Sequence, residues 1–76
     1  MEIKNFIQNF ANQFEEIDVA EFKEETKFRE LNEWNSLVAL SVIAMVDEEY
    51  DVTLKGNDIA SAVTVGDLYN VVRNKL

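Results

Sequence analysis

The stretch WNSLVALSVIAMVDEEY, from Trp34 to Tyr50, decides how this chain folds. Asn35 can cap a helix by accepting a backbone hydrogen bond through its side chain, and neither Gly nor Pro occurs between residues 36 and 50. A helix of about 22 Å follows, at about 1.5 Å per residue. Its apolar residues recur with helical spacing and predict one core-facing stripe, made of Ala39, Val42, Ile43, Val46 and Tyr50.

The side of this helix opposite the stripe is only partly polar. Its residues are Leu37, Ala44 and Met45, joined by Ser41 and Glu48. We therefore expect the helix to present apolar surface to something outside the domain. Ser36 falls in the first turn, where backbone N–H groups point outward and the helix dipole is positive.

Length and composition bound the possible functions. The 76 residues predict a single domain, residues 1–76, that buries only about two-thirds of its unfolded surface. The chain has no cysteine, hence no disulfide and no thiol nucleophile, which fits a reducing cytoplasmic setting. It also has no histidine, the commonest general base and metal ligand. We therefore expect neither an enzyme nor a metal site.

The formal net charge of −8 argues against nucleic acid and anionic membranes as partners and predicts attraction to basic protein surfaces. Acidity that merely keeps a small protein soluble is the simpler interpretation and stays open here. No run approaches the ~20 apolar residues of a membrane-spanning helix, and MEIKNF has no basic leader before an apolar segment. We expect a soluble cytoplasmic monomer.

Two segments precede the central helix. Residues 3–14 predict a first helix, with a core-facing stripe of Ile3, Phe6, Ile7, Phe10, Ala11 and Phe14. Residues 15–34 break this periodicity and hold eight of the fifteen acidic residues. We expect a long connection laid across the helices and pinned by apolar anchors, namely Ile17, Val19, Phe22, Phe28, Leu31 and Trp34. The three-residue spacing of the last three anchors predicts a short tight helical turn.

Residues after Tyr50 offer a weak strand pattern and a weak metal pattern. Val52 and Leu54 alternate with polar residues, but a two-residue strand would have no partner. The acids of this region, Asp47, Glu49, Asp51 and Asp58, raise the idea of a calcium loop. Val52 occupies the position where such a loop requires glycine, and the spacing is otherwise wrong, so we reject a calcium site.

The C-terminal third predicts two more helices. Residues 57–62 fit a short helix opened by Asn57 or Asp58, with Ile59 and Ala62 facing inward. Thr64 and Asp67 form a capping box for a fourth helix, and Val63 and Leu68 hold the positions of a hydrophobic staple. The stripe of this helix is Val65, Leu68, Tyr69, Val72 and Leu76. The predicted fold is all-α, a four-helix bundle with three long helices, one short third helix and a long first loop.

The run from Phe28 through Trp34-Asn35-Ser36-Leu37, the long helix ending Val-Asp-Glu-Glu-Tyr, and the later Asp58-Ile59 and Thr64-Val65-x-Asp67-Leu68 resemble the acyl carrier proteins over nearly the whole chain. In that family an Asp-Ser-Leu triplet opens the second helix, and its serine carries 4′-phosphopantetheine from coenzyme A through a phosphodiester. The resemblance implies that Ser36 is the attachment site. Spacing alone would leave Ser36 as an ordinary first-turn residue.

The resemblance has one departure at the triplet, where Asn35 replaces the usual Asp. Asn35 can still cap the helix but lacks a negative charge beside the modification site. Val38 and Ser41 also stand where carriers of primary fatty acid synthesis often have acids. The resemblance implies a partner surface that comprises Asn35, Leu37, Val38, Ser41, Ala44, Met45, Asp47 and Glu48. In a competing interpretation the long connection covers Val38 and Met45.

Acyl chains enter an apolar cavity between the helices in the resembling proteins. The residues that would line it here are Ile7, Leu40, Ile43, Val46, Leu54, Ile59, Ala62 and Leu68. A tightly filled core is an equally good interpretation of the same residues.

The leading hypothesis is an acyl carrier that presents thioesters, on an arm at Ser36, to enzymes of a fatty acid or specialised polyketide pathway. Its partners would be a phosphopantetheinyl transferase and synthases with basic surfaces. A peptidyl carrier of aminoacyl groups is a close variant, and an unmodified acidic helical binding module is the alternative from another class. A hydrolase that uses Ser36 is disfavoured, since no histidine and no Gly-x-Ser-x-Gly turn are present.

Overall fold

The computed structural model describes residues 2–76, which fold into four α-helices and two short 3₁₀ turns. In chain order these are α1 (Ile3–Ala11), η1 (Val19–Glu21), η2 (Phe28–Glu30), α2 (Ser36–Tyr50), α3 (Gly56–Ala60) and α4 (Val65–Lys75). Residues 2–76 contain no strand, only one isolated bridge between Lys27 and Thr64. The prediction of an all-helical domain with a short third helix is confirmed.

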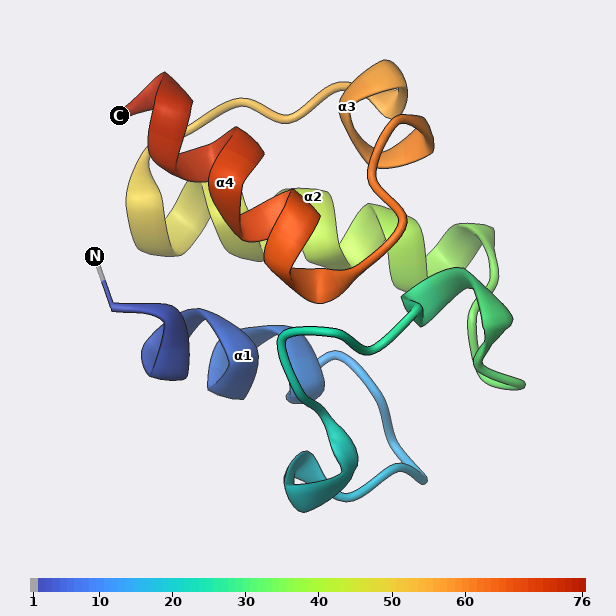
Figure 1. The fold of residues 1–76 in the computed structure, drawn as a ribbon. Coiled ribbons are helices and arrows are strands. Elements are labelled where there is room, and N and C mark those ends of the chain that lie inside the picture. The colour runs from blue at the N-terminus through green and yellow to red at the C-terminus, as the bar shows by residue number, and fades with distance from the viewer. Residues whose placement is uncertain (1) are drawn as a thin grey trace.

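α2 crosses the middle of the molecule in Figure 1. α1 contacts both α2 and α4, and α3 contacts α4. In this view α1 runs in one direction, whereas α2 and α4 run back in the other (Figure 1). No helix within residues 2–76 is long and apolar enough to cross a membrane.

α1 ends at Ala11, three residues before the predicted end. Two tight bonds follow it, from the N–H of Gln13 to the Phe10 carbonyl at 3.1 Å and from the N–H of Phe14 to the Ala11 carbonyl at 3.0 Å. Phe14 is nevertheless buried, with its ring centroid 4.9 Å from that of Phe22. The apolar spacing in the sequence continues past Ala11 because Phe14 is also a core residue. Phe14 lies in the turn after the helix and not in the helix itself.

The core-facing side of α2 differs from the prediction. Val42 and Val46 are fully buried as predicted, but their buried neighbours are Val38 and Met45. The remaining members of the predicted stripe, Ala39, Ile43 and Tyr50, are only partly buried. Apolar residues occur on nearly every side of α2, so spacing alone did not fix which face turns inward.

α2 is followed by a residue in the left-handed conformation and then by a segment without regular secondary structure. Asp51 has a φ of 55°, and its N–H donates to the Asp47 carbonyl at 3.0 Å. Val52 and Leu54 lie in this segment with 4% and 3% exposure. Among residues 2–76 no group of three potential metal ligands comes together.

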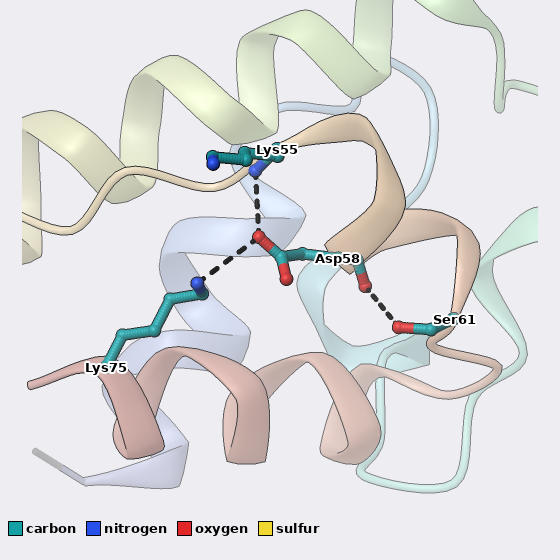
Figure 2. Close-up of polar contacts among 4 residues, drawn as sticks. All are labelled: Lys55, Asp58, Ser61 and Lys75. Carbon is teal, nitrogen blue, oxygen red and sulfur yellow. Dashed lines mark hydrogen bonds and ion pairs between the residues drawn. The ribbon is translucent and has the colours of Figure 1, made fainter.

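α3 begins one residue before the predicted start, and Figure 2 shows how Asp58 holds it. The Asp58 carboxylate accepts from the Lys55 N–H at 2.9 Å and lies 3.5 Å from the Lys75 ammonium, while the Ser61 hydroxyl donates to the Asp58 carbonyl at 3.1 Å (Figure 2). The backbone hydrogen bond from Lys55, helped by the charge of Lys75, lowers the pKa of Asp58. Ile59 and Ala62 are buried as predicted.

α4 begins as the capping box predicts. The Asp67 N–H donates to Thr64 Oγ1 at 3.0 Å, and the Thr64 N–H donates to Asp67 Oδ2 at 3.1 Å. Val65, Leu68 and Val72 are fully buried. The predicted end of the stripe is wrong, since Leu76 is 64% exposed, while the staple stays a prediction, with Val63 47% exposed and Leu68 buried.

The long connection is fastened to the start of α4, as expected of a segment laid across the helices. The N–H of Val65 donates to the Thr26 carbonyl at 3.0 Å, and the N–H of Gly66 donates to the Glu24 carbonyl at 2.8 Å. These bonds supply acceptors for first-turn N–H groups that a helix leaves unpaired.

One end of the core is rich in aromatic rings, most of them supplied by α1 and the long connection. Phe10 lies at its centre, with ring centroids between 5.5 and 6.4 Å from its neighbours Phe14, Phe22, Phe28 and Trp34. Such pairs add roughly 0.5–1.5 kcal/mol each beyond the area they bury. The connection is therefore part of the core and not a free loop.

Candidate functional site

Ser36 is the first residue of α2, and its side chain is exposed. Asn35 caps the helix, since its Oδ1 accepts from the Val38 N–H at 2.9 Å and its carbonyl accepts from the Ala39 N–H at 2.9 Å. The hydroxyl therefore stands on a fixed helix end, and the cap does not require the aspartate found in the resembling triplet.

The backbone around Ser36 favours an anionic group. Within residues 2–76, the N–H groups of Ser36 and Leu37 donate to no protein acceptor. A helix start combines such free donors with the positive end of the dipole, which suits a phosphate. The residues present thus fit a phosphate-linked group on the Ser36 hydroxyl.

The residues before Ser36 anchor the helix start to the core. The ring of Trp34 packs edge-on against that of Phe28, with centroids 4.8 Å apart. The backbone N–H of Trp34 donates to the Leu31 carbonyl at 3.0 Å. The Glu33 carboxylate accepts from the N–H groups of Glu15 and Glu16. The serine is consequently positioned both by the aromatic core and by the chain that leaves α1.

The predicted partner surface is only partly exposed. Of its members, those that face solvent are Asn35, Leu37, Ser41, Ala44, Asp47 and Glu48. Val38 and Met45 were placed wrongly, because they are 8% and 6% exposed and belong to the core. The competing interpretation is confirmed in that these two side chains are buried, while their cover by the long connection stays a prediction.

Leu40 was assigned to the cavity lining, and this too is wrong, since it is 61% exposed. It lies one turn after Leu37, which is 74% exposed, so the two side chains share a face beside Ser36. The signal that could have found this pair is their spacing of three residues. The same spacing also fits a core-facing position for Leu40, so it does not distinguish the two faces.

The other predicted lining residues lie in or against the core. Val46, Leu54, Ile59, Ala62 and Leu68 are at most 6% exposed and form one cluster. Ile7 and Ile43 are partly buried and pack against it. Entry of an acyl chain between these side chains stays a prediction.

A shallow depression adjoins the start of α2. It is lined by Gln13, Glu15, Glu33, Asn35, Leu37, Val38 and Ser41. Its two glutamates make it unsuitable for a second phosphate, so the free N–H groups of Ser36 and Leu37 are the better anion donors at this end of the molecule.

The domain is compact and helical, and Ser36 is exposed at a capped helix start beside backbone N–H groups without a protein acceptor. These are the features of a small carrier protein. Residues 5–72 match the family described as phosphopantetheine attachment site, and the chain belongs to that family. Its prosthetic group is 4′-phosphopantetheine, and carrier domains of this family are generally not catalytic themselves. No solved structure matches the chain.

Proposed function

We propose that Ser36 is the residue to which 4′-phosphopantetheine is attached and that the loaded protein carries acyl groups as thioesters to biosynthetic enzymes. The observation that supports this most is the exposed hydroxyl at the first residue of α2, within the part of the chain that matches the family. The prosthetic group supplies a thiol, which the chain lacks because it has no cysteine.

In this proposal the chain binds and orients, and performs no bond chemistry of its own. Asn35 fixes the first turn through Val38, and the N–H groups of Ser36 and Leu37 receive the phosphate. The rigid position of Ser36 gives the arm a defined origin, so a bound acyl group reaches successive enzymes at a raised effective concentration.

The proposed partner surface is the exposed apolar pair Leu37 and Leu40, with Ser41 and Ala44 beside it. The acids Asp47 and Glu48 lie further along α2. Partners that fit are a phosphopantetheinyl transferase and synthases with basic surfaces, steered by the net charge of −8. We propose a cytoplasmic monomer that works in a fatty acid or polyketide pathway.

The test is the intact mass of the apo protein after incubation with coenzyme A and a broad-specificity phosphopantetheinyl transferase. We expect one phosphopantetheinyl addition on the wild type and none on Ser36→Ala. The chain has only two other serines, so Ser41→Ala and Ser61→Ala are complete controls and should both be modified. A folded wild type that takes no group, or a Ser36→Ala variant that does, would overturn the proposal.

The variant Asn35→Asp tests whether slow modification is due to the absent negative charge at residue 35 or to the absence of an attachment site. If the transferase needs the acid, this variant is modified faster than the wild type while both end at one addition. If neither chain is modified, the unmodified acidic binding module becomes the better function.

Acyl and aminoacyl cargo are distinguished by loading. We expect the modified protein to accept acyl groups from an acyl-transferring enzyme and to be a poor substrate for amino-acid adenylating enzymes. The reverse preference would assign the chain to the peptidyl carriers.

A further inference from the structure

A groove with an apolar floor runs between the chain that leaves α1 and the chain that leaves η2. Its floor is formed by Ile17, Phe22 and Leu31. Phe22 is 5% exposed, whereas Ile17 and Leu31 are partly buried and pack against the core, so the groove reaches down to firmly held side chains. We refer to this feature, with its glutamate rim described next, as the acidic groove.

The polar rim of the acidic groove consists of four glutamates and one asparagine, and no lysine or arginine lines it; these residues are Glu16, Glu21, Glu30, Glu33 and Asn32. Within residues 2–76 the one ion pair joins Lys75 to Asp58, so none of the four glutamates has a cationic partner. Glu33 is occupied as an acceptor of two backbone N–H groups. The other three carboxylates are exposed and available.

The nearest arginine along the chain is directed elsewhere. The Arg29 guanidinium donates to the Ile59 carbonyl at 2.7 Å and lies 5.5 Å from the centroid of the Phe28 ring. The groove therefore combines an apolar floor with uncompensated negative charge at its rim. A ligand that complements it needs an apolar stem and a positively charged end.

We propose that the acidic groove binds an arginine side chain of a partner protein, together with an apolar residue next to that arginine. The methylene stem of the arginine and the apolar neighbour pack on Ile17, Phe22 and Leu31. The planar guanidinium donates paired hydrogen bonds to carboxylates of the rim. The lining of this groove does not include Ser36, Leu37 or Leu40, although Glu33 also lines the depression at the start of α2, and its binding does not require modification of Ser36.

The rim charges argue against the other occupants that could fill a groove. Nucleic acid and anionic lipid would be repelled by the same carboxylates. A divalent cation would require converging ligands, and no group of three lies together within residues 2–76. A cationic side chain with an apolar stem is the chemistry that both the floor and the rim favour.

The experiment is an NMR titration of the uniformly ¹⁵N-labelled apo protein with the capped pentapeptide Ala-Arg-Leu-Arg-Ala. We expect saturable shifts in the amides of residues 16–22 and 30–33, with amides of α4 unchanged. Ala-Gln-Leu-Gln-Ala should not bind, and Ala-Arg-Ser-Arg-Ala should bind more weakly because it leaves the floor uncovered.

Two double variants of equal charge separate the acidic groove from general attraction to an acidic protein. Glu21→Gln with Glu30→Gln changes the rim, and Glu2→Gln with Glu49→Gln changes two exposed acids that belong neither to the acidic groove nor to the proposed partner surface. We expect roughly fivefold weaker peptide binding for the rim variant, because it loses two exposed charge contacts with the peptide. The control variant should bind the peptide nearly as well as the wild type. Equal weakening in both, equal binding of the Ser-containing peptide, or shifts spread over all acidic segments would overturn the proposal. Because the apo protein is used, these outcomes are independent of Ser36 modification.

Discussion

The backbone N–H of Gly66 donates a 2.8 Å hydrogen bond to the carbonyl of Glu24, which brings the long connection directly against the first turn of α4. A β-carbon at residue 66 would lie 2.7 Å from Glu24 Cγ and 3.0 Å from its carbonyl oxygen. Glycine is therefore required here by the close approach of another backbone, and not by its own conformation. This contact holds together two parts of the chain that are distant in sequence.

Gly66→Ala should destabilise the protein. Alanine favours the helix, but the backbone of residue 24 has to move to admit the methyl group, and we expect a net loss of about 1–2 kcal/mol in the free energy of unfolding. Urea denaturation measures it. Gly56→Ala is the matched control, because no atom lies within 4 Å of a β-carbon there, and it should be neutral or more stable. Equal stability of the two variants would contradict the close approach.

Asn35→Ala should cost about 1 kcal/mol of stability, because the Val38 N–H loses its acceptor at the start of α2. Asn35→Asp should be at least as stable as the wild type, since a carboxylate also accepts this bond and complements the helix dipole. Urea denaturation compares both variants with Asn70→Ala, an exposed change within α4 that should have little effect. A harmless Asn35→Ala would show that the cap is dispensable.

Asp67 should make the fold sensitive to acid. The N–H groups of Thr64 and Val63 donate to its carboxylate and lower its pKa. A carboxyl whose pKa is lower in the folded state stabilises fully above its ordinary value of 3.8, and that contribution is lost as the pH falls through the folded-state pKa. Asp67→Asn should therefore lower Tm at pH 7, with the gap narrowing below pH 3.8. A gap that is constant with pH would contradict this account.

Leu37→Ser and Leu40→Ser should leave the fold intact and slow modification of Ser36. Both side chains are mostly exposed, so their loss removes little core contact, but each is expected to meet the transferase beside the serine. Modification rates followed by intact mass should fall roughly fivefold or more, the range of an interface anchor. Leu76→Ser is the control, since Leu76 is also 64% exposed and lies at the opposite end of the molecule from the start of α2 (Figure 1).

The parts of the fold that depend on local interactions could be predicted from the sequence. The start of α4 followed from Thr64 and Asp67, whose side chains bond to backbone within the same turn. The start of α2 followed from Asn35 in the same way. The end of α1 could not be found like this, because Phe14 keeps the helical spacing although a tertiary aromatic contact, and not a helix, places it in the core.

The site was predictable to the same degree. The position of Ser36 at an exposed, capped helix start is local, and the structure has it there. Local sequence does not determine which face of α2 is exposed, because that depends on which side of the helix the rest of the chain covers. Val38, Leu40 and Met45 were therefore misplaced, although the helix that carries them was correctly bounded.

The packing of Trp34 has a practical consequence. It is the chain's single tryptophan, it stacks among phenylalanine rings that α1 and the long connection contribute, and it lies two residues before the serine. Its fluorescence emission therefore comes from a single indole, whose ring contacts are lost when the domain unfolds. The protein thus carries an intrinsic optical probe two residues before Ser36, without any added dye.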